Sequence, residues 1–87
     1  MSYMFEEESR VNWKSSIMVS FVRTANGLSR EDYCKTLDIS PVELEMIEEG
    51  RVLPKASLIQ RICRKTKLSF AQMCGETESP KEAALFC

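Results

Sequence analysis

Four cysteines have the most varied chemistry in this chain, because a thiolate can act as a nucleophile, bind a metal ion or form a disulfide. They are Cys34, Cys63, Cys74 and Cys87, and no two of them have the close spacing that is usual for a pair of zinc ligands. The chain also contains no histidine. We therefore predict no metal site and no cofactor, and expect free thiols that pack as small hydrophobic side chains, with Cys87 at the surface.

No other residues form a recognisable catalytic group. The chain has no histidine, no glycine-rich phosphate-binding loop and no nucleophile paired with a base, so it is predicted not to be an enzyme. It has no run of about 18 consecutive apolar residues, and its N-terminus lacks the basic region of a signal peptide. We therefore expect no membrane attachment and a cytoplasmic protein, or a nuclear one if the source has a nucleus.

Size and composition predict one folded domain. With 87 residues, the chain lies near the lower limit for burying a core, and two domains would leave neither with enough apolar surface. Its 44% hydrophobic and 29% charged residues are typical of a folded protein rather than a disordered one.

The spacing of the apolar residues predicts an all-α fold with five helices. Three helices are expected near residues 11–25, 30–37 and 41–49, separated by Asn26-Gly27 and by the segment 38–40. Gly50 ends the third, a fourth contains residues 58–63, and a short fifth follows Ser69. We assign residues 1–10 to an acidic N-terminal arm, 11–75 to the helical domain, and 76–87 to a C-terminal tail that has the pattern for one helical turn.

The second and third helices, of about eight residues each, are joined by a turn of three or four residues, which is the layout of a helix-turn-helix unit. The residues in and after this unit resemble the signature of the phage-repressor (Cro/Xre) family. They are 27–34 (GLSREDYC), 37–40 (LDIS), Leu44, 47–48, Gly50, Pro54, 58–59, 62–63 and 68–70. The resemblance spans residues 17–73 and implies a five-helix, repressor-like domain with short extensions at both ends.

In that family the second helix of the unit lies in the major groove of DNA. The resemblance implies that four side chains of the 41–49 helix face the bases, with Glu45 at the margin: Pro41, Val42, Glu43 and Met46. It also implies four contacts to the DNA backbone, by Arg30, Ser40, Arg51 and Lys55.

The resemblance further implies an ion pair between Arg23 and Glu48 that holds the 41–49 helix in register. A partly buried pair is favoured, and the alternative is a solvated pair that contributes about 0 to 1 kcal/mol. Asp38 and Lys67 stand where the family usually has glycine, so we expect slight backbone strain at both positions.

The expected base-facing surface differs from the family pattern, which commonly offers Gln, Arg, Ser, Thr or Asn. Only Glu43 can hydrogen-bond a base, by accepting from cytosine, whereas Val42 and Met46 would contact a thymine methyl group. Residues 27–50 hold two basic and seven acidic side chains, a balance of −5 that phosphates would repel. Residues 51–67 hold six basic and no acidic ones, a balance of +6, so acids of the first segment could neutralise the second within the monomer.

The first helix has a second apolar stripe, formed by Trp13, Ile17 and Phe21 and offset from the one that faces the core. Either the terminal segments cover it through Phe5, Leu85 and Phe86, or it is exposed and binds a protein partner or a second copy of the chain.

Two functions are therefore weighed. The first is a transcriptional regulator, favoured as a homodimer, that binds double-stranded DNA with the 41–49 helix. The second is a protein-interaction module on the same fold that has lost the residues for DNA recognition, such as an antirepressor, an antitoxin or an adaptor.

Overall fold

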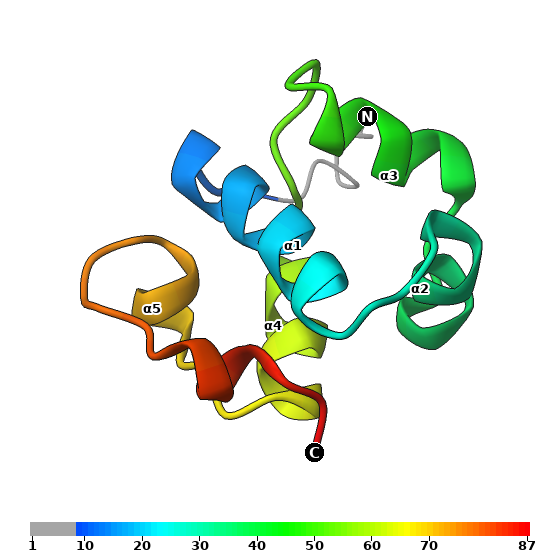
Figure 1. Ribbon diagram of the computed structural model, residues 1–87. Helices are drawn as coiled ribbons and strands as arrows, with labels where there is room; N and C mark the ends of the chain where they lie inside the picture. Colours follow the sequence, from blue (N-terminus) through cyan, green and yellow to red (C-terminus); the bar gives the residue numbers. More distant parts are fainter. Residues whose placement is uncertain (1–8) are drawn as a thin grey trace.

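Five α-helices follow one another along residues 9–87, the part of the chain that the computed structural model describes (Figure 1). They are α1 (Trp13–Ala25), α2 (Arg30–Leu37), α3 (Pro41–Glu48), α4 (Ala56–Lys65) and α5 (Phe70–Met73), and a 3-10 turn, η2 (Lys81–Ala84), follows them. No strand occurs in this part of the chain, and one isolated antiparallel bridge joins Arg10 to Lys55. The predicted all-α, five-helix fold is confirmed. Between residues 9 and 87, no helix combines the length and apolar character needed to cross a bilayer.

Polar side chains set where most of the helices begin. Ser29, Ser40 and Ser69 each accept a hydrogen bond from the backbone N–H three residues later, which satisfies a donor that the first helical turn leaves unpaired. Asn12 caps α1 in the same way, so this helix begins at Trp13 rather than near Val11 as predicted. The backbone N–H of Val11 instead donates to the carbonyl of Pro54, next to the bridge between Arg10 and Lys55.

One hydrophobic core lies between the helices. Its fully buried side chains come from all five of them, and they include Val19, Val22, Tyr33, Leu37, Leu44, Ile47, Ile59, Ile62 and Met73. The Tyr33 hydroxyl donates to the carbonyl of Val19 at 2.8 Å, so its polar atom is satisfied inside the core. This core fixes α2 and α3 against α1 and α4.

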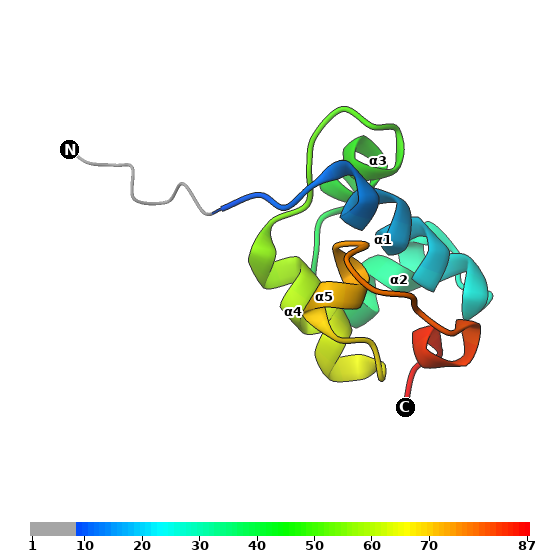
Figure 2. The same ribbon diagram turned by 90° about the vertical axis from the view of Figure 1, so that its left-hand side faces the viewer.

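The segment after α5 packs against the same core. Ala84 is fully buried, and the ring of Phe86 stacks on that of Tyr33, with the ring centroids 6.4 Å apart. Asn26, at the end of α1, donates to the carbonyl of Ala84 and accepts from the backbone N–H of Phe86. This segment and α3 lie at opposite ends of the molecule in both views (Figures 1 and 2).

The C-terminal segment does not cover the second apolar stripe of α1. Trp13 and Ile17 are 52% and 68% exposed, so the alternative in which this segment covers them is wrong. Phe21, the third residue of the stripe, is partly buried against the core, and Phe5 lies outside the described residues.

The two turn positions at which strain was expected differ. Asp38 has φ 57° and ψ 55°, and it is the one residue other than glycine with a positive φ between residues 9 and 87. Lys67 does not have a positive φ, because α4 ends at an extended Thr66. The Thr66 hydroxyl donates to the carbonyl of Ile62 and accepts from the backbone N–H of Leu68. The predicted strain is therefore present at Asp38 and absent at Lys67.

Candidate nucleic-acid interface

The turn between α2 and α3 is held on both sides. Asp38 ends α2 in the left-handed conformation, which allows the N–H of Ile39 to donate to the carbonyl of Cys34. Arg61 of α4 donates to the carbonyls of Leu37 and Asp38, at 2.9 and 3.1 Å. A cation thus satisfies carbonyls at the C-terminus of α2 and ties this turn to the next helix.

The outer face of α3 carries the predicted base-facing residues. Leu44 and Ile47 point into the core and are fully buried, as helical spacing requires. On the other side of the helix Val42 is 65% exposed, Pro41 and Glu45 are exposed, and Glu43 and Met46 are partly exposed. The structure therefore places Pro41, Val42, Glu43 and Met46 together around an accessible helix face.

A carboxylate with two arginines fixes the other end of α3. Arg23 Nε lies 2.8 Å from Glu48 Oε2, and Arg30 Nε lies 2.7 Å from Glu48 Oε1. Arg23 also donates to the carbonyl of Leu28 in the loop between α1 and α2. The Glu48 side chain is 3% exposed, which is too buried for a solvated pair. Glu48 therefore joins α3 to both α1 and α2.

The electrostatics of this cluster favour its charged form. Burial works against the carboxylate, but the hydrogen bonds from Arg23 and Arg30 outweigh burial and lower the pKa of Glu48 below its ordinary value of 4.5. The hydrogen bond with Glu48 raises the pKa of Arg30 in turn. Two positive charges thus face one negative charge, and the cluster keeps a net charge of +1.

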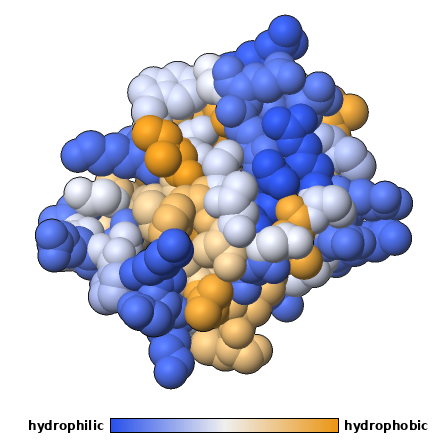
Figure 3. Space-filling view, viewed as in Figure 1, coloured by the Kyte–Doolittle hydropathy of each residue, from blue (hydrophilic) through white to orange (hydrophobic). Residues whose placement is uncertain are grey.

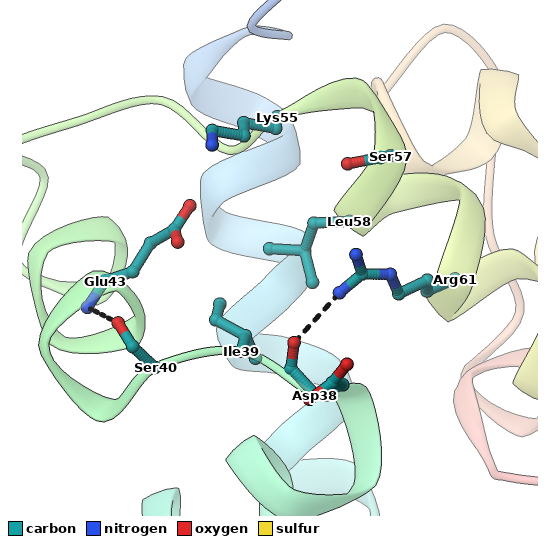
Figure 4. A pocket seen from close by; sticks show the side chains of 8 residues that line it. All are labelled: Asp38, Ile39, Ser40, Glu43, Lys55, Ser57, Leu58 and Arg61. Carbon is teal, nitrogen blue, oxygen red and sulfur yellow. Dashed lines mark hydrogen bonds between the residues drawn. The ribbon is translucent and has the colours of Figure 1, made fainter. Parts of the chain in front are cut away.

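The predicted backbone-contacting residues surround α3 but have different surroundings. Arg30 is engaged with Glu48 and remains 45% exposed. Arg51, just beyond the end of α3, lies 3.3 Å from the Glu49 carboxylate and is 70% exposed. Ser40 and Lys55 line a hollow of about 210 Å³ between the start of α3 and the start of α4. Figure 4 shows that α3 contributes Glu43 to the lining of this hollow and that Lys55 comes from the start of α4.

The positive charges of α4 are not neutralised by direct ion pairs. In the described part of the chain, no carboxylate lies within ion-pair distance of Arg61, Arg64 or Lys65. The suggestion that acids of residues 27–50 neutralise this basic segment therefore holds at contact distance for Arg51, which pairs with Glu49, and is wrong for the cations of α4. Among residues 9–87, Glu43 and Glu45 likewise have no cation at that distance, so the outer face of α3 remains acidic.

The cysteines take no part in this surface, and all four are free. Cys34 and Cys74 are buried, Cys63 is partly buried and Cys87 is exposed. Burial raises the pKa of the Cys34, Cys63 and Cys74 thiols, which keeps them protonated. Across residues 9–87 no three potential metal ligands gather at one place.

Two contacts of this surface were missed from the sequence. The first is the hydrogen bond between Arg30 and Glu48, and the second is the contact of Arg61 with the turn between α2 and α3. The opposite charges of Arg30 and Glu48 at the two ends of the unit were a usable signal for the first contact. For the second no signal existed, because Arg61 reaches backbone carbonyls that any residue would provide.

Comparison with known proteins identifies the same helices. A family model described as helix-turn-helix matches residues 21–73, which run from the second half of α1 through α5. No curated protein and no solved structure matches the chain.

Proposed function

Since the chain belongs to the Cro/Xre-like helix-turn-helix family of DNA-binding regulators, we propose that it is a dimeric transcriptional regulator that binds double-stranded DNA with α3 in the major groove. Members of this family that read two half-sites do so as dimers, which is the reason for including the second copy.

The observation that carries the proposal is that one face of α3 is fixed to the rest of the domain and the other is accessible to solvent. Glu48 ties its last turn to Arg23 and Arg30, and Leu44 and Ile47 anchor it to the core. The opposite face is left to solvent from Pro41 to Glu45. Because α3 is already held rigidly in the free protein, it would lose little conformational entropy when it enters the groove.

Three cations frame this helix. Arg30 begins α2, and Arg51 and Lys55 lie in the loop between α3 and α4. In the proposed complex, Arg51 and Lys55 contact phosphates, whereas Arg30 contributes mainly by supporting Glu48 and adds positive potential through its exposed part.

The side chains of α3 supply little direct base recognition. Glu43 would accept a hydrogen bond from a cytosine amino group, and Val42 and Met46 would contact thymine methyl groups. We therefore infer modest sequence preference from these contacts, with affinity that depends on salt because most of it comes from phosphates.

Titration with labelled duplex DNA tests the proposal. The chain is titrated against random duplexes and against duplexes enriched by selection, at about 50 and 200 mM salt. Binding that weakens with salt is expected, and Arg51→Ala and Lys55→Ala should each reduce the salt slope by about one. Lys81→Ala, in η2 at the opposite end, is the matched control and should leave the slope unchanged. A slope near zero together with no selectable duplex would overturn the proposal.

A second function rests on the acidity of the same face. In the part of the chain that the structure describes, Glu43 and Glu45 have no cation within ion-pair distance. They flank Val42, and this combination suits a protein surface with basic and apolar side chains. An antirepressor, antitoxin or adaptor would use α3 in this way. The absence of salt-dependent DNA binding, together with loss of biological activity in Val42→Asp, would favour this second function.

A further inference from the structure

The most exposed apolar side chains of α1 form a ridge apart from the residues of α3 that are proposed to face DNA. Trp13 and Ile17 are one helical turn apart, and they are 52% and 68% exposed. On the same helix Val19 and Val22 are fully buried. On the face shown in Figure 3, hydrophobic atoms gather over α1 and its neighbours, whereas hydrophilic side chains cover α3. We call Trp13 and Ile17 the α1 ridge.

The α1 ridge lies beside a groove that can receive a ridge of the same kind. Between α1 and the end of α3 is a hollow of about 310 Å³, lined beside the ridge by three small residues, Ser16, Ser20 and Gly50, and by Glu48 and Glu49 of α3 and its C-terminus. We call it the α1–α3 groove. Helices pack by placing the ridge of one into the groove of another, and small side chains allow a close approach.

Opposite charges border the ridge and the groove. Glu49 lies at the far edge of the α1–α3 groove and is 40% exposed, with Arg51 3.3 Å away. Lys14 lies on the other side of Ile17, because successive residues of a helix are rotated by about 100°. It lines a second hollow whose wall includes Gly75, and its methylene chain lies against that glycine.

From this arrangement we propose that two copies of the chain associate through α1, related by a two-fold axis that runs along the helix. The α1 ridge of each copy then lies in the α1–α3 groove of the other, so that one patch serves both partners, as a two-fold interface requires. This inference deepens the proposed dimeric regulator by naming its dimer surface.

The charges select the direction of the axis. If the two-fold axis runs parallel to α1, the Lys14 side of each copy faces the Glu49 side of the other, so that residues of opposite charge meet. With the axis across α1, Lys14 would meet Lys14 and Glu49 would meet Glu49, and such like-charge contacts are unfavourable. A specific dimer buries about 800 Å² on each partner. Trp13 and Ile17 alone are too small for this area, so the surface around Lys14 and Glu49 must also be buried.

Sedimentation equilibrium of the full chain tests the dimer without DNA, so its failure is distinguishable from a failure of DNA binding. Over about 1 to 100 µM protein, the wild type should show a reversible monomer–dimer equilibrium. Ile17→Asp should raise the dissociation constant about 30-fold or more, as expected for a central anchor. Val42→Asp is the matched control, because Val42 is a similarly exposed aliphatic residue of α3, and the dimer should be unchanged.

Trp13 provides an independent measurement, because it is the single tryptophan of the chain. Its emission should shift to longer wavelength as the wild type is diluted, and this dependence should vanish in Ile17→Asp. Circular dichroism verifies that both aspartate variants remain helical, which is expected because the substituted side chains are exposed.

Charge exchange tests the axis. Lys14→Glu and Glu49→Lys should each weaken the dimer, and the double variant should restore the wild-type dissociation constant within about threefold. A wild type that stays monomeric, an Ile17→Asp variant that still dimerises, dissociation caused by Val42→Asp, or a double variant that is not restored would each overturn the proposal.

Discussion

Arg30 Nε lies 2.7 Å from Glu48 Oε1, so the first residue of α2 is joined to the last residue of α3 across the helix-turn-helix unit. Arg23 of α1 binds the other oxygen of the same carboxylate. The spacing of three helices thus depends on one nearly buried charge.

The first prediction concerns the stability that this charge provides. The substitution Glu48→Gln keeps the size of the side chain but leaves the guanidinium groups of Arg23 and Arg30 without a counter-charge. We expect the free energy of unfolding to fall by about 2 kcal/mol, below the full effect of breaking a buried pair because Arg30 is half exposed. Urea denaturation measures this change.

Glu49→Gln is the control for that measurement. Its carboxylate is the next in the chain, is 40% exposed, and lies 3.3 Å from Arg51. An exposed pair of this kind contributes less than about 1 kcal/mol. If Glu48→Gln were no more destabilising than Glu49→Gln, the Glu48 cluster would not hold the helices together.

The second prediction is a pH dependence with a definite sign. The pKa of Glu48 is lower in the folded chain than its ordinary value of 4.5, so the unfolded chain binds this proton more readily. The stability from Glu48 is therefore complete above that value and is lost as the pH falls through it toward the folded pKa. The difference in unfolding free energy between the wild type and Glu48→Gln should shrink below about pH 4.5. A difference that stays constant down to pH 3 would contradict this assignment.

Much of the fold could be predicted from local signals. Ser29 and Ser40 mark the starts of α2 and α3, and the spacing of the apolar residues predicted both helices within one residue of their observed bounds. These signals work because capping and helical periodicity act over a few residues. The start of α1 was misplaced by two residues, because Val11 pairs with Pro54, more than 40 residues away along the chain.

The site was less predictable because its contacts are long-range. Arg30 was assigned to DNA phosphates, and its engagement with Glu48 depends on how the core places α2 against α3. Likewise, Phe86 packs against Tyr33 and leaves Trp13 and Ile17 exposed, although one of the two alternatives had Phe86 among the side chains that cover them. Helical spacing predicts which face is apolar, but it does not predict what will cover that face.

The third prediction concerns the left-handed turn residue. Asp38 adopts φ 57°, where a Cβ atom is unfavourable and glycine is not. Asp38→Gly should therefore raise the free energy of unfolding by up to about 1 kcal/mol, whereas Asp38→Ala should lower it, because alanine tolerates this conformation less well than aspartate. Thermal and urea unfolding compare the two variants. Equal stability of the glycine and alanine variants would show that the backbone conformation at Asp38 is not the limiting factor.

The last prediction addresses the acidic face of α3. Glu45 is exposed at the edge of the expected DNA-facing surface, and no cation of the described residues lies within ion-pair distance of it, so its charge should repel phosphates. Glu45→Gln should strengthen binding to duplex DNA about twofold to fivefold at low salt, and the gain should diminish at high salt because mobile ions screen the repulsion. Glu82→Gln in η2 removes the same charge at the opposite end and should have little effect. Equal gains in both variants would indicate that only net charge matters, and α3 would then not face the DNA.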